Sequence, residues 1–208
     1  NLYACLGGNR YKWGNEHEIT AVEWDPELAR LYQERFTSDK VIVADAHQYL
    51  LEHYKEYDFI WSSPPCPTHS RVRITQKNKK TFVDKYPDMS LYQQVIFLDN
   101  FFKGKYVVEN VIPYYEPLIP AKKRGRHLYW TNFNLPSNLN ERAGGIMSSL
   151  NELNKWSKFH DYDFRKYKGN QRVDKIARNL VDYEAGKTIL DTVLGIQTRQ
   201  NINQTELF

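Results

Sequence analysis

Apolar and polar positions follow two different periods along residues 1–133. Short runs rich in β-branched and aromatic residues have the length of strands, and they alternate with longer segments of helical period. The helix signal is clearest in "DPELARLYQERF", where Asp25 stands at the N-cap position and Pro26 at the first helical position. We expect strands over 2–6, 17–25, 40–45, 57–63, 105–110 and 126–133, and helices over 26–36, 46–54 and 90–102.

Strands that alternate with helices are typical of βαβ units. The sequence therefore predicts an α/β protein with a mainly parallel, doubly wound sheet. The alternation is lost near Phe133, where "NLPSNLNERAGGIMSS" reads as a loop, and helical patterns follow up to about Ile196. No internal repeat or low-complexity tract interrupts the pattern.

Chemically useful residues follow five of the predicted strands at their carboxyl ends. In an open parallel sheet these ends share one edge, and ligands bind beside that edge. We therefore expect one site there, although each of these residues taken alone has an ordinary structural explanation. The strand ends carry, in chain order, Gly7 and Gly8, then Glu23, then Asp45, then Pro64, Pro65 and Cys66, and finally Glu109 and Asn110.

Composition is that of an ordinary globular protein. The chain of 208 residues is 41% apolar and 26% charged, which is enough for one core with a small appended lobe. Its net charge of +4 is too small to indicate a polyanionic partner by itself. The 15 tyrosines, 10 phenylalanines and 5 tryptophans suit a stacking surface or a core equally well.

Targeting signals are missing from the sequence. The start "NLYACLGGNR" lacks the basic and apolar regions of a signal peptide, and no segment reaches the length of a membrane helix. Two cysteines, Cys5 and Cys66, do not make a secreted disulfide scaffold. We expect a soluble, cytoplasmic protein without a membrane partner or a bound metal. The chain opens directly into a predicted strand without Met, so a few residues are expected to be missing.

Several residues at the first three strand ends suit a nucleoside ligand. Gly7 and Gly8 permit a close backbone approach, but an ordinary turn explains them as well. Glu23 is placed to accept hydrogen bonds from a ribose diol, and Trp24 offers a ring for an adenine to stack on. Asp45 either accepts from an adenine amino group or caps the following helix.

Cys66 and Glu109 give a more specific indication of function than the residues at the first three strand ends. They follow strands that we expect to be neighbours, and a thiolate beside a carboxylic acid suits nucleophilic addition to a ring while the acid protonates a ring nitrogen. A buried, inert cysteine remains the alternative. Arg124 and Arg126 stand two apart at the start of the sixth predicted strand, so one of them could lower the thiol pKa and bind a base carbonyl. A solvated basic turn explains them otherwise.

A basic segment follows Cys66 directly. "PTHSRVRITQKNKKTFV" holds five basic residues and no acidic one. Long loops inside a compact domain are usually functional, so this one suits a lid that closes on phosphates. Its basic residues are Arg71, Arg73, Lys77, Lys79 and Lys80.

Seven short motifs, taken in chain order, resemble those of the S-adenosylmethionine-dependent DNA cytosine-C5 methyltransferases. They are "NLYACLGG", "VEWD", "ADAHQYL", "SSPPC", "VVENV", "KKRGR" and "RNLVDYEAGKTILDTVLG". The resemblance covers nearly the whole chain and is that of a short bacterial or phage form. It implies a Rossmann-like methyltransferase fold with a catalytic core at 1–133, a short target-recognition segment at 134–176 and a C-terminal region at 177–208 that returns to the core.

The resemblance also implies a role for each residue of the site. The catalytic set would be Cys66, Glu109, Arg126 and Arg124. The cofactor S-adenosyl-L-methionine, which leaves as S-adenosyl-L-homocysteine, would be bound by Tyr3, Ala4, Gly7, Gly8, Glu23, Trp24, Asp45, Ala46, Pro64 and Asn179. The substrate would be bound by Pro65, Ser70, Arg71, Arg73, Lys77, Lys79, Lys80, Asn110 and Val111.

The implied activity is methylation of C5 in a cytosine that is flipped out of double-stranded DNA. A cognate restriction enzyme would be a further partner, and the enzyme would act as a monomer in a bacterial or phage-infected cell. Departures from the family are Tyr3 and Cys5 in the first motif, Pro67 and His69 after the cysteine, and Lys122 for a glutamine. The alternatives are an RNA cytosine-C5 methyltransferase, an exocyclic-amino methyltransferase, for which an aromatic residue would replace Cys66, and a silent DNA-binding relative.

Overall fold

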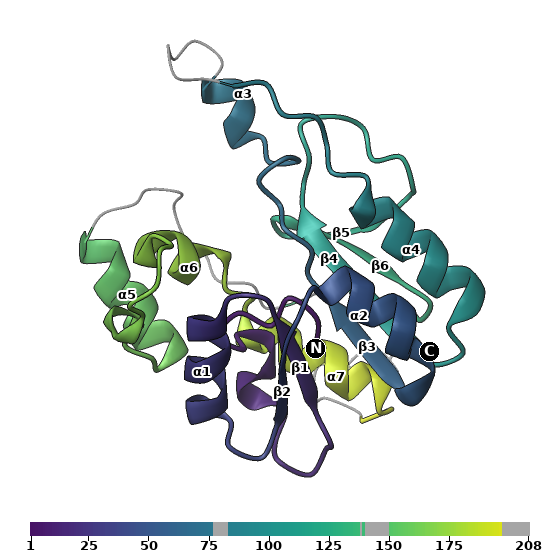
Figure 1. Cartoon of the computed structure of the whole chain (residues 1–208). Helices are drawn as coiled ribbons and strands as arrows, with labels where there is room; N and C mark the ends of the chain where they lie inside the picture. The colour runs from purple at the N-terminus through teal and green to yellow at the C-terminus, as the bar shows by residue number, and fades with distance from the viewer. Residues whose placement is uncertain (77–82, 138, 140–149, 197–208) are drawn as a thin grey trace, which may run out of the picture. The chain divides into compact units, whose positions relative to one another are not determined.

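The computed structural model describes residues 1–76, 83–137, 139 and 150–196, and Figure 1 shows its elements. They form two compact units. The first unit contains Asn1, Tyr3–Asp45 and the described residues of Asn138–Phe208, and the second contains Leu2 and Ala46–Ser137. In the described part of the chain, no helix is both long enough and apolar enough to cross a membrane.

The first unit is built on two parallel strands. Strand β1 (Thr20–Glu23) pairs with β2 (Lys40–Val43) in a register that places Glu23 opposite Val43. Helix α1 (Pro26–Arg35) connects them, and the side chain of Asp25 accepts hydrogen bonds from the backbone N–H groups of Glu27 and Leu28. The predicted N-cap and the proline at the start of this helix are therefore confirmed.

The core of the first unit joins its two halves, which lie far apart in the sequence. Leu6, Leu28 and Leu31 pack against residues of the C-terminal helices such as Trp156 and Phe164. Burial of these large side chains supplies the main stabilisation of this unit. The C-terminal elements are α5 (Leu150–His160), η3 (Phe164–Lys166), α6 (Val173–Asn179) and α7 (Tyr183–Val193), and η1 (Asn9–Lys12) lies in the N-terminal half.

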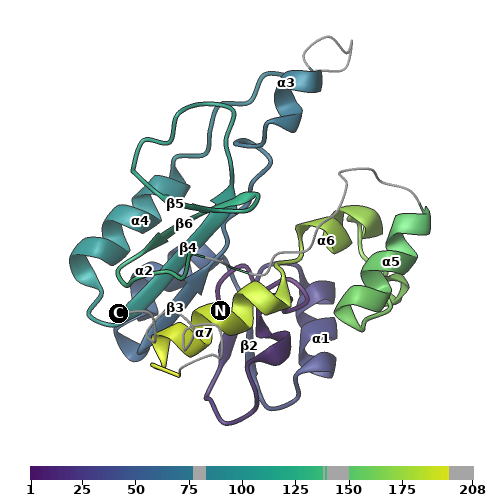
Figure 2. The same ribbon diagram turned by 180° about the vertical axis from the view of Figure 1, so that it is seen from behind.

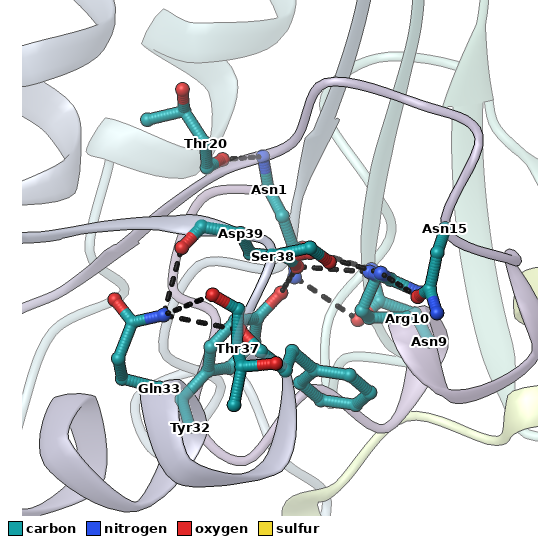
Figure 3. Close-up of polar contacts among 11 residues, drawn as sticks. Asn1, Asn9, Arg10, Asn15, Thr20, Tyr32, Gln33, Thr37, Ser38 and Asp39 are labelled. Atoms are coloured by element: carbon teal, nitrogen blue, oxygen red, sulfur yellow. Dashed lines mark hydrogen bonds and ion pairs between the residues drawn. The ribbon is translucent and has the colours of Figure 1, made fainter.

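A buried ion pair fixes the start of this unit (Figure 3). Arg10 Nε lies 2.9 Å from Asp39 Oδ2, and both side chains are almost completely inaccessible to solvent. Tyr32 donates its hydroxyl proton to the same carboxylate over 2.9 Å, and the second guanidinium nitrogen of Arg10 donates to Asp39 Oδ1. Because a buried charge is stable only with such partners, this network holds η1 against the segment that precedes β2.

The first predicted strand does not form. Residues 2–6 contribute only an isolated parallel bridge between Leu2 and Ser62. The reason is the backbone, since Tyr3 and Cys5 have φ angles of 55° and 48°. Positive φ interrupts an extended chain, and it is uncommon for residues other than glycine.

The second unit contains a four-stranded sheet in the order β3-β4-β6-β5. Strands β3 (Phe59–Ser62) and β4 (Lys105–Val111) are parallel, whereas β6 (His127–Thr131) is antiparallel to both β4 and β5 (Lys122–Arg124). Helices α2 (Ala46–His53) and α4 (Ser90–Phe101) lie on the same face of this sheet (Figures 1 and 2). The predicted α/β class, with helices beside a sheet that contains parallel strands, is confirmed.

Two short elements complete the second unit. They are η2 (Tyr54–Glu56) and α3 (Val72–Gln76), and α3 lies inside the basic segment that we predicted as a loop. The predicted strand over 126–133 is also different, because it forms a hairpin with β5. Arg124 faces His127 across this hairpin, and Gly125, with φ of 50°, lies in the turn. Arg124 and Arg126 therefore do not share a strand, which corrects the prediction that they do.

Candidate active site

The turn that carries Cys66 is attached to the neighbouring strand by one side chain. Asn110 lies within β4, and its side-chain nitrogen donates to the carbonyl oxygen of Pro64 over 2.9 Å. The oxygen of the same amide accepts from the backbone N–H of Val111 over 2.9 Å. Asn110 is buried, so these bonds are shielded from water. Cys66 follows Pro64 by two residues, a reach of roughly 7 Å, and therefore lies beside the carboxyl end of β4.

The backbone after Cys66 forms a helical turn. The N–H groups of His69 and Ser70 both donate to the carbonyl oxygen of Cys66, over 3.0 and 3.1 Å. Ser70 forms a bridge with Pro113, and Arg71 Nε donates to the carbonyl oxygen of Pro113 over 3.1 Å. The thiol thus sits at the start of a turn that is bound to Asn110 of β4 on one side and to Pro113 just after β4 on the other, while Pro65 beside it is exposed.

His69 is the buried centre of this turn. Its ring is 1% exposed, and its Nδ1 lies 2.5 Å from the hydroxyl oxygen of Tyr115. Tyr92 of α4 donates its hydroxyl proton to Tyr115 over 3.3 Å. The other ring nitrogen, Nε2, is buried and has no hydrogen-bond partner among the residues that the structure describes. Burial lowers the pKa of His69, although the nearby carboxylate of Asp88 acts in the opposite direction.

Glu109 is an acidic residue inside a strand that is largely apolar. Four of the seven residues of β4 are Tyr106, Val107, Val108 and Val111, and Glu109 between them is only 7% exposed. Its Oε1 lies 3.5 Å from Nε2 of His127 on β6. No local signal in the sequence marks His127. Tyr129 is the register partner of Glu109, and His127 lies two residues before Tyr129 on β6. Its place beside Glu109 therefore follows only from the antiparallel register of β4 and β6.

The two arginines of the predicted catalytic set lie in different settings. Arg124, in β5, donates through its guanidinium to the carbonyl oxygens of Leu135 and Pro136. Arg126 lies in the exposed hairpin turn, and its carbonyl oxygen accepts from the N–H of Ile112 just after β4. The backbone of Arg126 is therefore near the end of β4, whereas the guanidinium of Arg124 is used to hold the segment after β6.

The basic segment is described only in part. Arg73, in α3, donates to the carbonyl oxygen of Val83 over 2.8 Å, and Arg71 is exposed. The predicted substrate residues Lys77, Lys79 and Lys80 lie outside the described residues. Whether the segment contacts phosphates stays a prediction.

In the first unit, the turn at residues 3–8 is held by Glu23. One carboxylate oxygen of Glu23 accepts from the N–H of Cys5 over 2.8 Å, and the other accepts from the N–H of Asp25 over 3.0 Å. Burial raises the pKa of Glu23, and these hydrogen bonds oppose the rise. The turn closes through the N–H of Gly7, which donates to the carbonyl oxygen of Ala4 over 2.8 Å. Glu23 thus joins the first two of the predicted cofactor motifs.

The C-terminal half of the first unit lies directly on Gly8. A Cβ atom at this position would lie 2.2 Å from the carbonyl oxygen of Val181 and 2.6 Å from Leu180 Cγ. Both residues follow Asn179, the exposed last residue of α6. Asn179 therefore lies next in sequence to the residues that pack on Gly8, and its predicted contact with the cofactor stays a prediction. The close approach that requires Gly8 is made by the protein's own chain.

The remaining predicted cofactor residues are distributed over both units. Trp24 follows Glu23 and is 75% exposed, so its ring is not part of the core. Asp45 follows β2 and is exposed, whereas Ala46 and Pro64 are buried residues of the second unit. The first unit thus gathers Tyr3, Ala4, Gly7, Gly8, Glu23, Trp24 and Asn179 around the turn and the end of β1.

Neither cysteine forms a disulfide in the part of the chain that the structure describes. Cys5 packs against the core of the first unit, and burial raises the pKa of its thiol, with Glu23 adding to the rise. The described residues also contain no cluster of three or more His, Cys, Asp or Glu side chains that would hold a metal ion. The raised pKa makes the thiol of Cys5 a poor nucleophile at neutral pH.

Comparisons with known proteins give a match to a family and partial matches to solved structures. The model of the C-5 cytosine-specific DNA methylases matches residues 1–116, a range that contains Cys66 and Glu109. No curated protein matches the chain. A hypothetical protein from Thermus thermophilus is 18% identical, with a TM-score of 0.34, over 56% of this chain and 62% of that chain. A proposed methyltransferase from Escherichia coli is 12% identical, with a TM-score of 0.35, over 55% and 61%.

The chain spans about three fifths of the length of each of these two structures. The family match covers residues 1–116, which is more than half of the 208 residues. Its range includes the glycine turn, Glu23, the Cys66 turn and β4. The chain belongs to the family of C-5 cytosine-specific DNA methylases.

Proposed function

We propose that this protein is a DNA methyltransferase that transfers a methyl group from S-adenosyl-L-methionine to C5 of a cytosine, through a covalent bond to Cys66. The observation that carries the proposal is the bond from Asn110 to Pro64, which attaches the Cys66 turn to the strand of Glu109. Family membership supports cytosine as the base and C5 as its methylated atom.

Cys66 and Glu109 divide the chemistry of the base between them. The ring carbons of cytosine are poor nucleophiles, so the thiolate first adds to C6 and a new S–C6 bond forms. Glu109 donates its proton to N3, which accepts the charge that would otherwise build up on the ring. The electron pair of the C5–C6 double bond then becomes available at C5 for methylation. Loss of the C5 proton restores the double bond and breaks the S–C6 bond, which releases Cys66, and N3 returns its proton to Glu109.

The residues of the first unit fit the proposed cofactor. S-adenosyl-L-methionine supplies an electrophilic methyl group when it is bound. Each carboxylate oxygen of Glu23 accepts one backbone N–H, and a carboxylate retains further lone pairs for a ribose diol. The exposed ring of Trp24 offers a face on which an adenine would stack. Asn179 would contribute a polar side chain next to the turn at Gly8.

The proposed macromolecular substrate is double-stranded DNA. Arg71 and Arg73 flank the start of α3 just after the thiol, where a duplex substrate would bring its phosphates. Arg126, in the exposed turn near the end of β4, would bind the base carbonyl or a phosphate. The segment 134–176 would read the target sequence, and a cognate restriction enzyme remains a proposed partner of a monomeric enzyme. RNA is the alternative substrate.

The test is transfer of labelled methyl groups to DNA and RNA of defined sequence. We expect wild type to label C5 of cytosine in duplex DNA, and bisulfite sequencing to locate the methylated sites. Cys66→Ser should abolish turnover, because a serine hydroxyl is a far weaker nucleophile at neutral pH. Glu109→Gln should lower the rate by about 10² or more, the typical scale of a lost general acid.

Trapping distinguishes the covalent route from other routes. DNA with 5-fluorocytosine at the target should form a stable adduct with wild type, because fluorine at C5 cannot leave as a proton does. Cys66→Ser should form no adduct but should bind S-adenosyl-L-homocysteine as wild type does in calorimetry. Methylation by Cys66→Ser at close to the wild-type rate would disprove the assignment of the nucleophile. If RNA is labelled and DNA is not, the proposed substrate is wrong, whereas the proposed reaction of Cys66 with cytosine is retained.

A further inference from the structure

The residue next to the proposed acid is a histidine that the sequence analysis did not single out. His127 Nε2 lies 3.5 Å from Glu109 Oε1, and the two side chains are 20% and 9% exposed. His127 is the register partner of Val111 on β4, so it lies on the same face of the sheet as Glu109. A titratable ring thus stands beside the carboxyl group that the proposed reaction needs in its protonated form.

The groups around His127 come from all three strands of this part of the sheet. Glu109 on β4 favours the protonated imidazole, because an opposite charge stabilises it. Arg124 on β5 is its register partner and opposes protonation, although that guanidinium is bound to backbone carbonyls. Arg126 precedes it in the turn, and the ring of Tyr129 lies 6.4 Å away on β6. Glu109 is the carboxylate that lies within ion-pair distance of His127.

We propose that His127 supplies the proton that Glu109 donates to the base, an inference that rests on the proposed function. The imidazolium of His127 transfers its Nε2 proton to the carboxylate of Glu109, and the O–H bond so formed breaks as an N3–H bond forms. The pair is then a carboxylate and a neutral imidazole. When the C5 proton leaves and the S–C6 bond breaks, N3 returns its proton along the same path, so the pair is restored and no oxidant or further reactant is needed.

An ordinary histidine holds its proton up to about pH 6.5, so the ring of His127 can store a transferable proton close to neutral pH. In the proposed relay the base is protonated only while His127 carries that proton. The loss of His127 should therefore move the alkaline limb of the activity profile to lower pH. At neutral pH we expect a loss of up to about 10² in rate, the scale of a lost general acid.

The experiment measures kcat/KM for DNA methylation from pH 5 to pH 9 in wild type and in His127→Gln. Glutamine keeps an N–H donor near Glu109 but cannot titrate, so it separates proton supply from hydrogen bonding. We expect the alkaline limb of the variant to move down as stated. In the Glu109→Gln background the same change should have little further effect, because the two residues act in one step.

The control is His53→Gln. His53 Nδ1 lies 2.7 Å from Glu56 Oε1, so this change removes a second histidine–glutamate pair, located on α2 and η2 of the same unit. Its pH profile should match that of wild type. An alkaline limb that stays in place in His127→Gln would overturn the inference, whether the rate is unchanged or uniformly lower, since a uniform loss indicates a structural role.

A second measurement does not depend on activity. Nuclear magnetic resonance titration of the His127 ring should give a higher pKa in wild type than in Glu109→Gln, because the carboxylate stabilises the imidazolium. An equal pKa in the two proteins would also overturn the inference. Wild-type protein that methylates no cytosine, with a shifted His127 pKa, would instead disprove the proposed function and retain the pair.

Discussion

At the scale of single residues, the second unit buries a histidine whose backbone N–H closes the turn of the proposed nucleophile. His69 packs near the rings of Tyr92 and Tyr115, and its N–H donates to the carbonyl oxygen of Cys66. A phenylalanine would fill the same space without a polar atom. The imidazole adds the contact with the Tyr115 hydroxyl, and it also introduces a group that acid can charge.

We predict that His69 makes the folded state sensitive to acid. Burial lowers its pKa in the folded protein, so below about pH 6.5 the unfolded chain binds a proton that the folded chain resists. The free energy of unfolding should therefore fall as the pH is lowered through this range, and the stabilisation should be complete above it.

Urea denaturation at pH 7.5 and at pH 5.5 measures this effect. His69→Gln should show a smaller loss of stability between the two pH values than wild type does, even if it is less stable at both. His53→Gln, which changes a far more exposed ring, should lose as much as wild type. Equal losses in wild type and His69→Gln would contradict the prediction.

At the scale of elements, the glycine turn of the first unit is shaped by packing. Gly8 has a φ of −57°, which any residue adopts, so its backbone does not require glycine. Glycine is required at position 8 because the carbonyl oxygen of Val181 occupies the space that a side chain would need there. Gly186 of α7 likewise faces the backbone of Asn9. These contacts join the N-terminal turn to the C-terminal helices.

We predict that Gly8→Ala destabilises the protein by about 2–3 kcal/mol, the cost of forcing an extra methyl group into a packed site. The C-terminal segment should also become easier to cleave in limited proteolysis, because it must move away from the turn. Gly195→Ala is a suitable comparison, since its Cβ would meet no atom within 4 Å but its φ is 70°. That change should cost only about 1 kcal/mol, from backbone strain. Equal losses would show that packing at Gly8 is unimportant.

Local sequence signals were sufficient where an element is specified by its own residues. Helix α1 begins as predicted because Asp25 and Pro26 cap it from within the same segment. The first predicted strand failed because positive φ at Tyr3 and Cys5 has no signature in residues of these types. The hairpin at Gly125 was missed, although a glycine between basic residues can mark a two-residue turn.

The candidate site was likewise predictable only where its residues stand out in the local sequence. Cys66 and Glu109 were identified because reactive side chains at strand ends are visible in the chain itself. His127 was missed, because its contact with Glu109 depends on an antiparallel register that joins distant segments. The roles of both arginines were inferred from their place in a short segment, but two of the carbonyl partners of Arg124 belong to Leu135 and Pro136, more than ten positions away.

At the scale of the whole molecule, one unit is continuous in sequence and the other is not. The second unit is made almost entirely from Ala46–Ser137. The first requires both Tyr3–Asp45 and the C-terminal helices, because Leu6, Leu28 and Leu31 share a core with Trp156 and Phe164. The indole N–H of Trp13 also donates to the carbonyl oxygen of Gly186, over 3.0 Å.

We predict that a chain ending at Ser137 keeps the second unit and loses the first. Without α5, α6 and α7, Leu28 and Leu31 of α1 lose most of their core partners, so the remaining burial is too small for stability. Hydrogen exchange should show protection in β3 and β4 but not in β1 and β2. Calorimetry should detect no binding of S-adenosyl-L-homocysteine, whereas full-length protein should bind it. Protected β1 and β2 in the truncated chain would contradict this prediction.

The interrupted sequence of the first unit also sets an order of events on the ribosome. Ala46–Ser137 emerges as a continuous stretch and can fold as soon as it is free, whereas Tyr3–Asp45 must wait for α7. At about 5–20 residues per second, synthesis of 138–196 takes roughly 3–12 s. Throughout that interval the Cys66 turn of the nascent chain can be folded, whereas the unit that carries the proposed site for the methyl donor cannot yet fold. If the proposed function holds, the enzyme cannot begin to modify DNA before α7 has been synthesised.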